Sequence, residues 1–189
     1  RSWSAMANGS ITHFGPADKI APLLPAGTKV KNYGKDALIS AGFIDSHVHF
    51  PQVPMIAAYG DQLLDWLNTY TYPTEMKYTD KEFAREVAKV FLQQNLRNGI
   101  TTACVYCTVY PQSVDALFEE AERLGMRLAA GKVLMNRNAP DKLLDTTKSG
   151  YDDSKALIGK WHGRGRLMYA ITPRFAATST RDQLESAGA

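Results

Sequence analysis

Two histidines separated by one residue, His47 and His49, lie at the end of the apolar stretch 42–50 and make up half of the chain's four histidines. On a β-strand successive side chains point to opposite faces, so both imidazoles should project from one face with Cβ atoms ~6 to 7 Å apart. Neutral imidazole nitrogens suit Zn²⁺, although a catalytic zinc needs further protein ligands and an open position. The pair therefore predicts two ligands of a metal site. The alternative is that ordinary hydrogen bonds hold both rings.

Asp45 precedes His47 by two residues and has the same strand parity. A carboxylate in that position could orient one of the imidazole rings. The alternative is a hydrogen bond to nearby backbone, which is the more common role of an aspartate near a strand end.

The two cysteines, Cys104 and Cys107, have the spacing of a redox or metal-binding pair. Positions i and i+3 of a strand point to opposite faces, however, no second pair with this spacing is present, and the next helix begins only at Pro111. The pattern favours structural cysteines. Two cysteines are also too few for a secreted disulfide framework, which favours a reducing, cytoplasmic location.

Elements that could position the histidines alternate along the chain after residue 42. Short apolar runs predict strands at 42–49, 100–106, 127–135 and 167–172. Helices are predicted at about 62–70, after Thr79, at 111–124, at about 151–162 and from about 180. This alternation is typical of βα units around a parallel sheet. In a parallel barrel the carboxyl ends of the strands face the active site, and the histidine pair lies at such an end.

The long helix after Thr79 has the clearest boundary signals. Thr79 and Glu82 have the spacing of a capping box. Four apolar positions, Phe83, Val87, Val90 and Phe91, follow at helical spacing and predict its buried face.

Residues 1–41 differ from the rest, because turn signals there separate short apolar pieces such as 10–12 and 37–39, which predict short strands. From residue 42 the chain carries four βα units, half of an eight-unit barrel that takes ~250 residues. An open α/β sheet is the alternative. Because the sequence begins without Met and ends inside a helical pattern, we expect a fragment of a longer protein.

Composition excludes some classes of protein. The chain has 189 residues, 44% hydrophobic and 22% charged, with a net charge of +3 and no Lys/Arg run longer than two. We therefore expect no nucleic-acid or membrane partner. No stretch approaches the ~20 apolar residues of a membrane helix.

The stretch AGFIDSHVH at 41–49 resembles the metal-binding signature of the amidohydrolase superfamily, with Ala41 and Ser46 as departures. Five further blocks resemble the guanine deaminase family within it: HFPQ (49–52), AYGDQLLDWLNTYTYPTE (58–75), NGITTACVY (98–106), AGKVLMNRNAPDKLLDT (130–146) and YAITPRF (169–175). The resemblance spans roughly Gly9 to the last residue, and residues 1–6 do not match.

This resemblance implies a distorted (β/α)₈ barrel with a small β-sandwich built from both ends of the chain. Residues 1–41 would be part of the sandwich and 42–189 the amino-terminal half of the barrel. The implied reaction is the hydrolytic deamination of guanine to xanthine and ammonia in purine breakdown, with one Zn²⁺ per subunit lowering the pKa of its bound water. His47 and His49 match the first two zinc ligands. The other family ligands, two histidines and an aspartate, and the catalytic glutamate would lie beyond residue 189.

The resemblance also assigns substrate-binding residues. Those that match the family's guanine pocket are His49, Phe50, Pro51, Gln52, Arg174 and Phe175. A glutamine amide can donate to and accept from a purine edge, a guanidinium fork matches the O6/N7 edge of guanine, and a ring can cover a purine face. Without the resemblance, Gln52 reads as an ordinary loop residue, and Arg174 and Phe175 as an exposed charge beside a packing aromatic.

Three hypotheses remain open from the sequence. The first is a guanine deaminase, a homodimer when complete, with guanine and water as its substrates. The second is a related amidohydrolase that acts on a triazine or another purine. The third is that the 189-residue chain is itself an inactive fragment, which pairs through an exposed sheet edge or does not fold.

Overall fold

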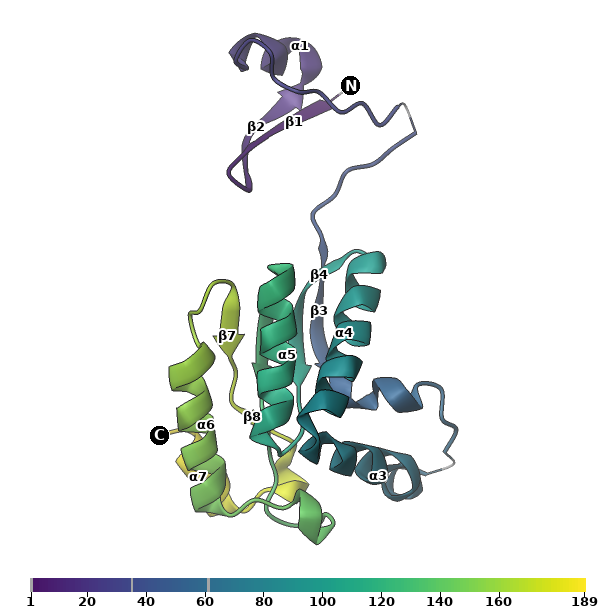
Figure 1. Cartoon of the computed structure of the whole chain (residues 1–189), viewed down its shortest axis with the longest axis vertical. Coiled ribbons are helices and arrows are strands. Elements are labelled where there is room, and N and C mark those ends of the chain that lie inside the picture. Colours follow the sequence, from purple (N-terminus) through teal and green to yellow (C-terminus); the bar gives the residue numbers. More distant parts are fainter. Residues whose placement is uncertain (1, 35, 61) are drawn as a thin grey trace. The chain divides into compact units, whose positions relative to one another are not determined.

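The computed structural model describes residues 2–34, 36–60 and 62–189; residues 1, 35 and 61 lie outside this description. The chain divides into two compact units, Arg1–Ala41 and Gly42–Ala189 (Figure 1).

The first unit is built on a β-hairpin. Strands β1 (Ser2–Ala7) and β2 (Ser10–Pro16) pair antiparallel, and Asn8 and Gly9 between them have φ of 51° and 76°. Positive φ at both loop residues matches the right-handed twist of the strands, which explains the Asn-Gly pair. A short helix α1 (Ala17–Ile20) and a 3₁₀ turn (Ala21–Leu23) follow.

The strand predicted at 37–39 is wrong. These residues have neither helix nor strand structure, and Leu38 is 93% exposed. Strands are stabilised by a hydrogen-bonded neighbour, and within the described part of this unit β1 and β2 pair only with each other. Three apolar residues without a partner strand do not form one.

The second unit contains a four-stranded parallel sheet in the order β3-β4-β5-β7. Its strands are β3 (Phe43–His49), β4 (Ile100–Tyr106), β5 (Arg127–Gly131) and β7 (Leu167–Tyr169). A two-residue parallel pair, β6 (Val133–Leu134) with β8 (Thr172–Pro173), continues β5 and β7 toward their carboxyl ends. Within the four-stranded sheet, each strand lies beside the next one of that sheet in sequence, as the alternation of strands and helices predicts.

Three long helices cover one face of this sheet (Figure 1). They are α4 (Lys81–Arg97), α5 (Pro111–Leu124) and α6 (Thr147–Trp161), and the shorter α7 (Arg181–Ala187) is the last helix of the described residues. The main core lies between helices and sheet, where Leu92, Leu117 and Leu128 are fully buried. Val90, predicted on the buried stripe, is 48% exposed, because Ala88 and Leu92 face the sheet instead.

Among the described residues, no helix covers the opposite face of the sheet in the way that α4, α5 and α6 cover the first, and this face carries the candidate site. Along β4 the residues Ala103 and Val105 are buried under the helices, whereas Cys104 between them is exposed. Cys107 is buried and Cys104 exposed, so the two thiols lie apart, as strand alternation predicts. Purely parallel sheets are nearly always covered on both faces, so this open face is the unusual feature of the unit.

The start of α4 corrects the predicted capping box. Asp80, not Thr79, is the N-cap residue, and its Oδ1 accepts hydrogen bonds from the backbone N–H groups of Glu82 (2.9 Å) and Phe83 (3.4 Å). The Thr79 hydroxyl instead donates to the carbonyl of Met76 at 3.2 Å and ends a preceding 3₁₀ turn. Aspartate is a more favourable N-cap than threonine, so the capping-box spacing of Thr79 and Glu82 did not exclude the adjacent Asp80.

We expect Asp80→Ala to lower the free energy of unfolding by about 0.5–2 kcal/mol, because two N–H groups of the first turn lose their acceptor. Thr79→Ala, the matched control one residue away, should cost less than about 0.5 kcal/mol. Urea unfolding of the two variants measures both losses of free energy. A larger loss for Thr79→Ala than for Asp80→Ala would contradict the assignment of Asp80 as the N-cap and favour the predicted capping box of Thr79 and Glu82.

The segment between β3 and α4 is mostly helical. A 3₁₀ helix (Phe50–Met55) follows β3 directly. Further on, α2 (Leu63–Trp66), a π-helical turn (Leu67–Thr71), α3 (Tyr72–Glu75) and a 3₁₀ turn (Met76–Thr79) form one continuous run, longer than the predicted 62–70. Pro73 has no N–H to donate to the preceding turn, and the wider π turn accommodates it.

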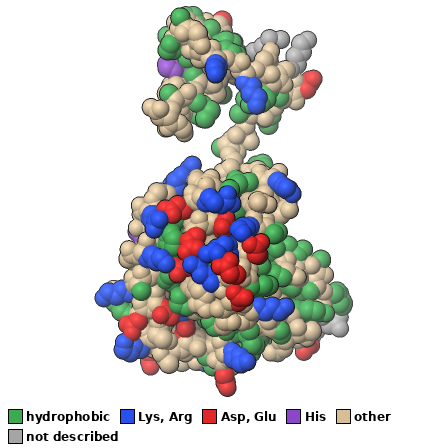
Figure 2. All heavy atoms as spheres, in the orientation of Figure 1, with side chains coloured by type: hydrophobic (Ala, Val, Ile, Leu, Met, Phe, Trp, Pro, Cys, Tyr) green, Lys and Arg blue, Asp and Glu red, His purple; other side chains and the backbone are tan. Residues whose placement is uncertain are grey.

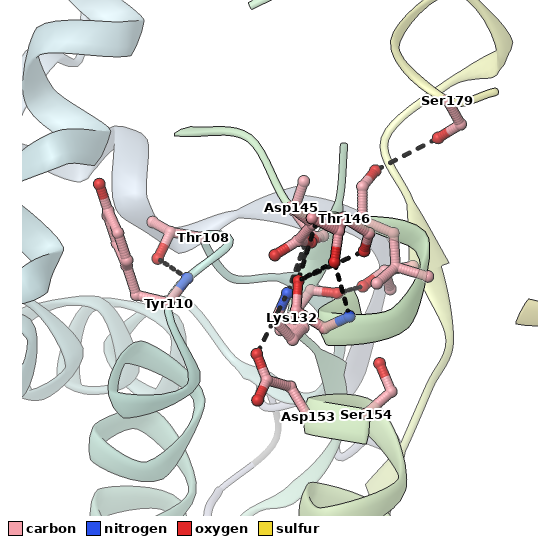
Figure 3. A network of polar contacts seen from close by, with 12 residues as sticks. Thr108, Tyr110, Lys132, Asp145, Thr146, Asp153, Ser154 and Ser179 are labelled. Atoms are coloured by element: carbon pink, nitrogen blue, oxygen red, sulfur yellow. Dashed lines mark hydrogen bonds and ion pairs between the residues drawn. The ribbon is translucent and has the colours of Figure 1, made fainter. Parts of the chain in front are cut away.

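The third predicted strand, 127–135, is interrupted at Lys132, between β5 and β6. Lys132 is fully buried, and its Nζ lies 2.7 Å from Oδ2 of Asp145 (Figure 3). A Cβ on the preceding residue, Gly131, would lie 1.8 Å from the carbonyl oxygen of Ala170, so the close approach of the two chain segments requires glycine there.

Helix α6 begins at Thr147, four residues before the predicted start at 151. The capping box is made by Thr146 and Ser149, each side chain bonded to the other's backbone N–H. The last strand, predicted as one run over 167–172, is likewise divided into β7 and β8.

Basic and acidic side chains are intermixed on the face shown in Figure 2. Ion pairs join neighbouring helices, including Lys81–Glu119 at 2.6 Å and Lys160–Asp115 at 2.8 Å. No helix in the described ranges combines the length and the apolar character that crossing a membrane requires.

Candidate active site

His47 and His49 come together on the open face of the sheet, near the carboxyl end of β3. Their ring centroids lie 5.3 Å apart with an interplanar angle of 63°. Tyr106, at the end of the neighbouring strand β4, stacks on His49 at 4.8 Å and contacts His47 at 5.0 Å. The tyrosine ring thus supports both imidazoles from the next strand, a role that the sequence pattern did not indicate.

The environment of His49 favours the neutral imidazole. Burial, the positive charge of Arg174 and the neighbouring His47 lower the pKa of His49 to about 4. Its Nδ1 is buried and has no hydrogen-bond partner among the described residues. A neutral ring with an unpartnered nitrogen is the form in which histidine binds a metal ion.

The described residues do not by themselves form a complete metal site. No group of three or more His, Cys, Asp or Glu side chains in the described part of the chain is arranged to hold a metal ion. The convergent rings and the unpartnered Nδ1 fit two nitrogen ligands of a zinc-type site, which has at least three protein ligands.

Asp45 bonds to backbone rather than to an imidazole ring. Its Oδ1 accepts a hydrogen bond from the N–H of His47 at 3.1 Å. The register between β3 and β4 shifts between Asp45 and Val48, and this irregularity interrupts the strict alternation from which the shared face of Asp45 was predicted. The structure therefore favours the backbone-binding alternative for Asp45.

The block that follows His49 begins a 3₁₀ helix in which Phe50, Pro51 and Met55 are buried. Phe50 is fully buried against Tyr78 and Phe91, and the carbonyl of Pro51 accepts a hydrogen bond from the Tyr78 hydroxyl at 3.1 Å. These contacts fix the position of the 3₁₀ helix against Tyr78 and α4.

Gln52, in the same 3₁₀ helix, is half-buried and shares a cavity of about 450 Å³ with the histidine pair. Gln94 and Asn95 of α4 also line this cavity. The amide of Gln52 is therefore near enough to the two imidazoles to belong to one site with them.

Arg174 and Phe175 follow β8 at the same end of the sheet as His49. The Arg174 backbone N–H donates to the carbonyl of Leu134 at 3.1 Å, which fixes the chain after the strand. Its charge contributes to the lowered pKa of His49, so the guanidinium and the imidazole pair belong to one electrostatic environment. The Phe175 ring is 47% exposed.

Glu75 and Tyr72 of α3 complete the surroundings of Arg174 and were missed as functional candidates. Glu75 accepts two hydrogen bonds from Arg174, and the Tyr72 ring centroid lies 5.6 Å from the guanidinium carbon. The only signal was the position of both residues in the block 58–75, because their partner is about a hundred residues away.

Comparisons with known proteins agree with this geometry. Residues 38–188 match the amidohydrolase family. The guanine deaminase of Escherichia coli is 54% identical over 179 residues, which cover 95% of this chain and 40% of that protein. The chain therefore spans about two fifths of the length of this curated relative.

Solved structures give the same picture. The E. coli guanine deaminase superposes with a TM-score of 0.92 at 52% identity, over 97% of this chain and 42% of that one. A guanine deaminase from C. acetobutylicum, with guanine bound in its active site, superposes with a TM-score of 0.89 at 26% identity, over 99% of this chain and 44% of that one.

A third solved structure is more distant. The atrazine chlorohydrolase of Arthrobacter aurescens, complexed with zinc and atraton, superposes with a TM-score of 0.70 at 22% identity. The match covers 77% of this chain and 37% of that one, and it shows the fold alone. The α/β fold with its parallel sheet and the family match over most of the length lead to one assignment. This chain belongs to the amidohydrolase family.

Proposed function

We propose that the protein containing this chain is a guanine deaminase, which hydrolyses guanine to xanthine and ammonia. The observation that carries the proposal is the convergence of His47, His49 and the charge of Arg174 at the carboxyl ends of parallel strands, in a chain 54% identical to the E. coli guanine deaminase. Active sites of parallel barrels lie at this end.

In this proposal His47 and His49 are two ligands of one Zn²⁺ per subunit. Bound zinc supplies a Lewis acid and lowers the pKa of a coordinated water toward ~7. The contribution of this chain is to hold the two imidazoles in place, with Tyr106 stacked on His49 and in tilted contact with His47. The other ligands and the catalytic glutamate come from the part of the protein that this chain does not include.

The purine is held by the residues around the histidine pair. Gln52 can both donate to and accept from a ring edge. Arg174 recognises the O6/N7 edge of guanine, and the exposed Phe175 ring covers a purine face. Phe50 and Pro51 fix the 3₁₀ helix that presents His49 and Gln52.

The open face of the sheet supports a larger architecture. We propose that the rest of the protein closes it into a (β/α)₈ barrel and completes a β-sandwich with residues 1–41. Closure would bury the apolar Ile44, which is 70% exposed, and Met168, which is 40% exposed. We further propose a homodimer that acts in the cytoplasm.

The experiment that tests this function uses the full-length protein that contains this chain, loaded with zinc. Guanine loss and xanthine formation are followed together, with a triazine such as atraton as the alternative substrate. We expect equal rates of guanine loss and xanthine formation. No turnover of guanine alongside hydrolysis of the triazine would instead establish the related amidohydrolase.

A further inference from the structure

The buried contact between Glu75 and Arg174 is the most enclosed ion pair near the candidate site. The side chains are 1% and 5% exposed, respectively. Nη1 of Arg174 lies 3.0 Å from Oε1 and 2.8 Å from Oε2 of Glu75, so one guanidinium nitrogen contacts both carboxylate oxygens. The partners are 99 residues apart in sequence, which makes this a tertiary contact between α3 and the segment after β8.

Glu75 and Tyr72 both contact the guanidinium group of Arg174. Both belong to α3, three residues apart, and such residues share one side of a helix. The Tyr72 ring lies 5.6 Å from the guanidinium carbon. The π-helical turn Leu67–Thr71 immediately precedes these residues, and single π turns inside helices are common at functional sites.

Stability alone does not explain a carboxylate at this position. Burial raises the pKa of Glu75, while the charge and hydrogen bonds of Arg174 oppose that effect. Removing two charges from water costs about as much as their attraction returns, so a buried ion pair has little advantage over apolar residues of the same size. What such a pair does provide is a fixed orientation of a long, flexible side chain.

The geometry also leaves part of Arg174 available. Its side-chain hydrogen bonds to described residues all come from Nη1, which leaves Nε and Nη2 as donors for a further acceptor. Arg174 directly follows β8, so these donors lie at the carboxyl ends of the parallel strands, the end at which β3 carries His49.

We propose that Glu75 is a positioning residue that holds Arg174 so that its remaining donors recognise the oxygen at C6 of a 6-oxopurine, with Tyr72 supporting the guanidinium. This inference rests on the proposed function, since it assigns the acceptor as part of guanine. It predicts that replacing Glu75 weakens only the contact between Arg174 and the C6 oxygen of the substrate, and leaves the other contacts of the site unchanged.

Glu75→Gln in the full-length, zinc-loaded protein tests this proposal. The amide keeps the shape but loses the charge, so we expect KM for guanine to rise about tenfold, with kcat within about threefold of wild type. The inhibition constant of hypoxanthine, which has the C6 oxygen, should rise about tenfold. The inhibition constant of unsubstituted purine, which lacks the C6 oxygen, should change less than about twofold.

Matched variants separate positioning from general damage. Glu120→Gln removes another buried glutamate, paired with Arg123 at 2.9 Å on α5, and should leave both inhibition constants unchanged. If Glu75→Gln does not fold, Tyr72→Leu takes its place, with a hypoxanthine-specific loss of about threefold.

The outcomes distinguish this inference from the proposed function. Guanine turnover with equal weakening of hypoxanthine and purine overturns the positioning role and leaves the function intact. Hypoxanthine binding that depends on Glu75, without guanine turnover, keeps the positioning role and refutes the deaminase. Binding of neither purine refutes both.

Discussion

Replacing His47 or His49 with alanine in the full-length protein is expected to lower kcat/KM for guanine by at least about a thousandfold. The two rings converge at 5.3 Å and are the proposed metal ligands in this chain. A Lewis acid contributes several kcal/mol to charge stabilisation in a reaction of this class, and either substitution removes one of its few ligands. Bound zinc should fall together with activity.

His13→Ala is the control for this prediction. His13 belongs to the first unit, where its Nδ1 contacts the Thr12 hydroxyl at 3.1 Å, and it is not one of the residues of the proposed site. Zinc content is measured by elemental analysis of each purified variant, and activity by xanthine formation. Wild-type turnover in His47→Ala or His49→Ala would refute the metal role of that residue.

Lys132→Met is expected to destabilise the protein by about 3–5 kcal/mol, the usual cost of removing one partner from a buried ion pair. Lys132 is fully buried, and its Nζ lies 2.7 Å from Asp145 and 4.0 Å from Asp153 (Figure 3). The substitution leaves the carboxylate of Asp145, itself 9% exposed, without its cation.

The backbone of Lys132 is fixed as firmly as its side chain. Its carbonyl accepts from the Thr172 hydroxyl at 2.7 Å, and its N–H donates to the Tyr169 hydroxyl oxygen at 3.3 Å. Lys132 therefore joins three segments, the break between β5 and β6, the loop before α6, and the segment around β7 and β8. Loss of the lysine charge should therefore destabilise all three segments.

Lys148→Met is the matched control, because Lys148 pairs with Asp152 on the exposed surface of α6. Exposed ion pairs contribute little, so this variant should unfold like wild type. The double variant Lys132→Met with Asp145→Leu should recover much of the lost stability, since no charge is then left buried alone. Urea unfolding of the full-length variants measures these differences, and equal midpoints for Lys132→Met and wild type would contradict the prediction.

Much of the second unit could be predicted from periodicity, because its strands and helices are long and bury one clear face. The strand 100–106 and the helix 111–124 begin and end where the sequence signals place them. Gly125 ends that helix in the left-handed conformation, with φ of 63°. Local signals are sufficient where neighbouring residues decide the structure.

Features that depend on distant residues could not be predicted in the same way. The break at Lys132 follows from tertiary contacts to Asp145, Tyr169 and Thr172. The pairing of Glu75 with Arg174 joins segments 99 residues apart. The N-cap of α4 is a different case, because aspartate is the stronger N-cap residue and the spacing of Thr79 and Glu82 pointed to its neighbour instead.

The candidate site shows the same limits. Alternation along β3 was enough to predict that the two imidazoles converge, but the register shift before Val48 removed Asp45 from that pattern. The stacking of Tyr106 on His49 depends on the parallel register of β3 and β4, in which these two residues are paired.

The central claim is that His47 and His49 bind one metal ion together. Its most direct test is a crystal structure of the zinc-loaded full-length protein, with anomalous scattering measured at the zinc edge. We predict one zinc peak per subunit, with one ring nitrogen of His47 and one of His49 each at about 2.0–2.1 Å from it. Zinc bound elsewhere, with both of these rings unligated, would contradict the account.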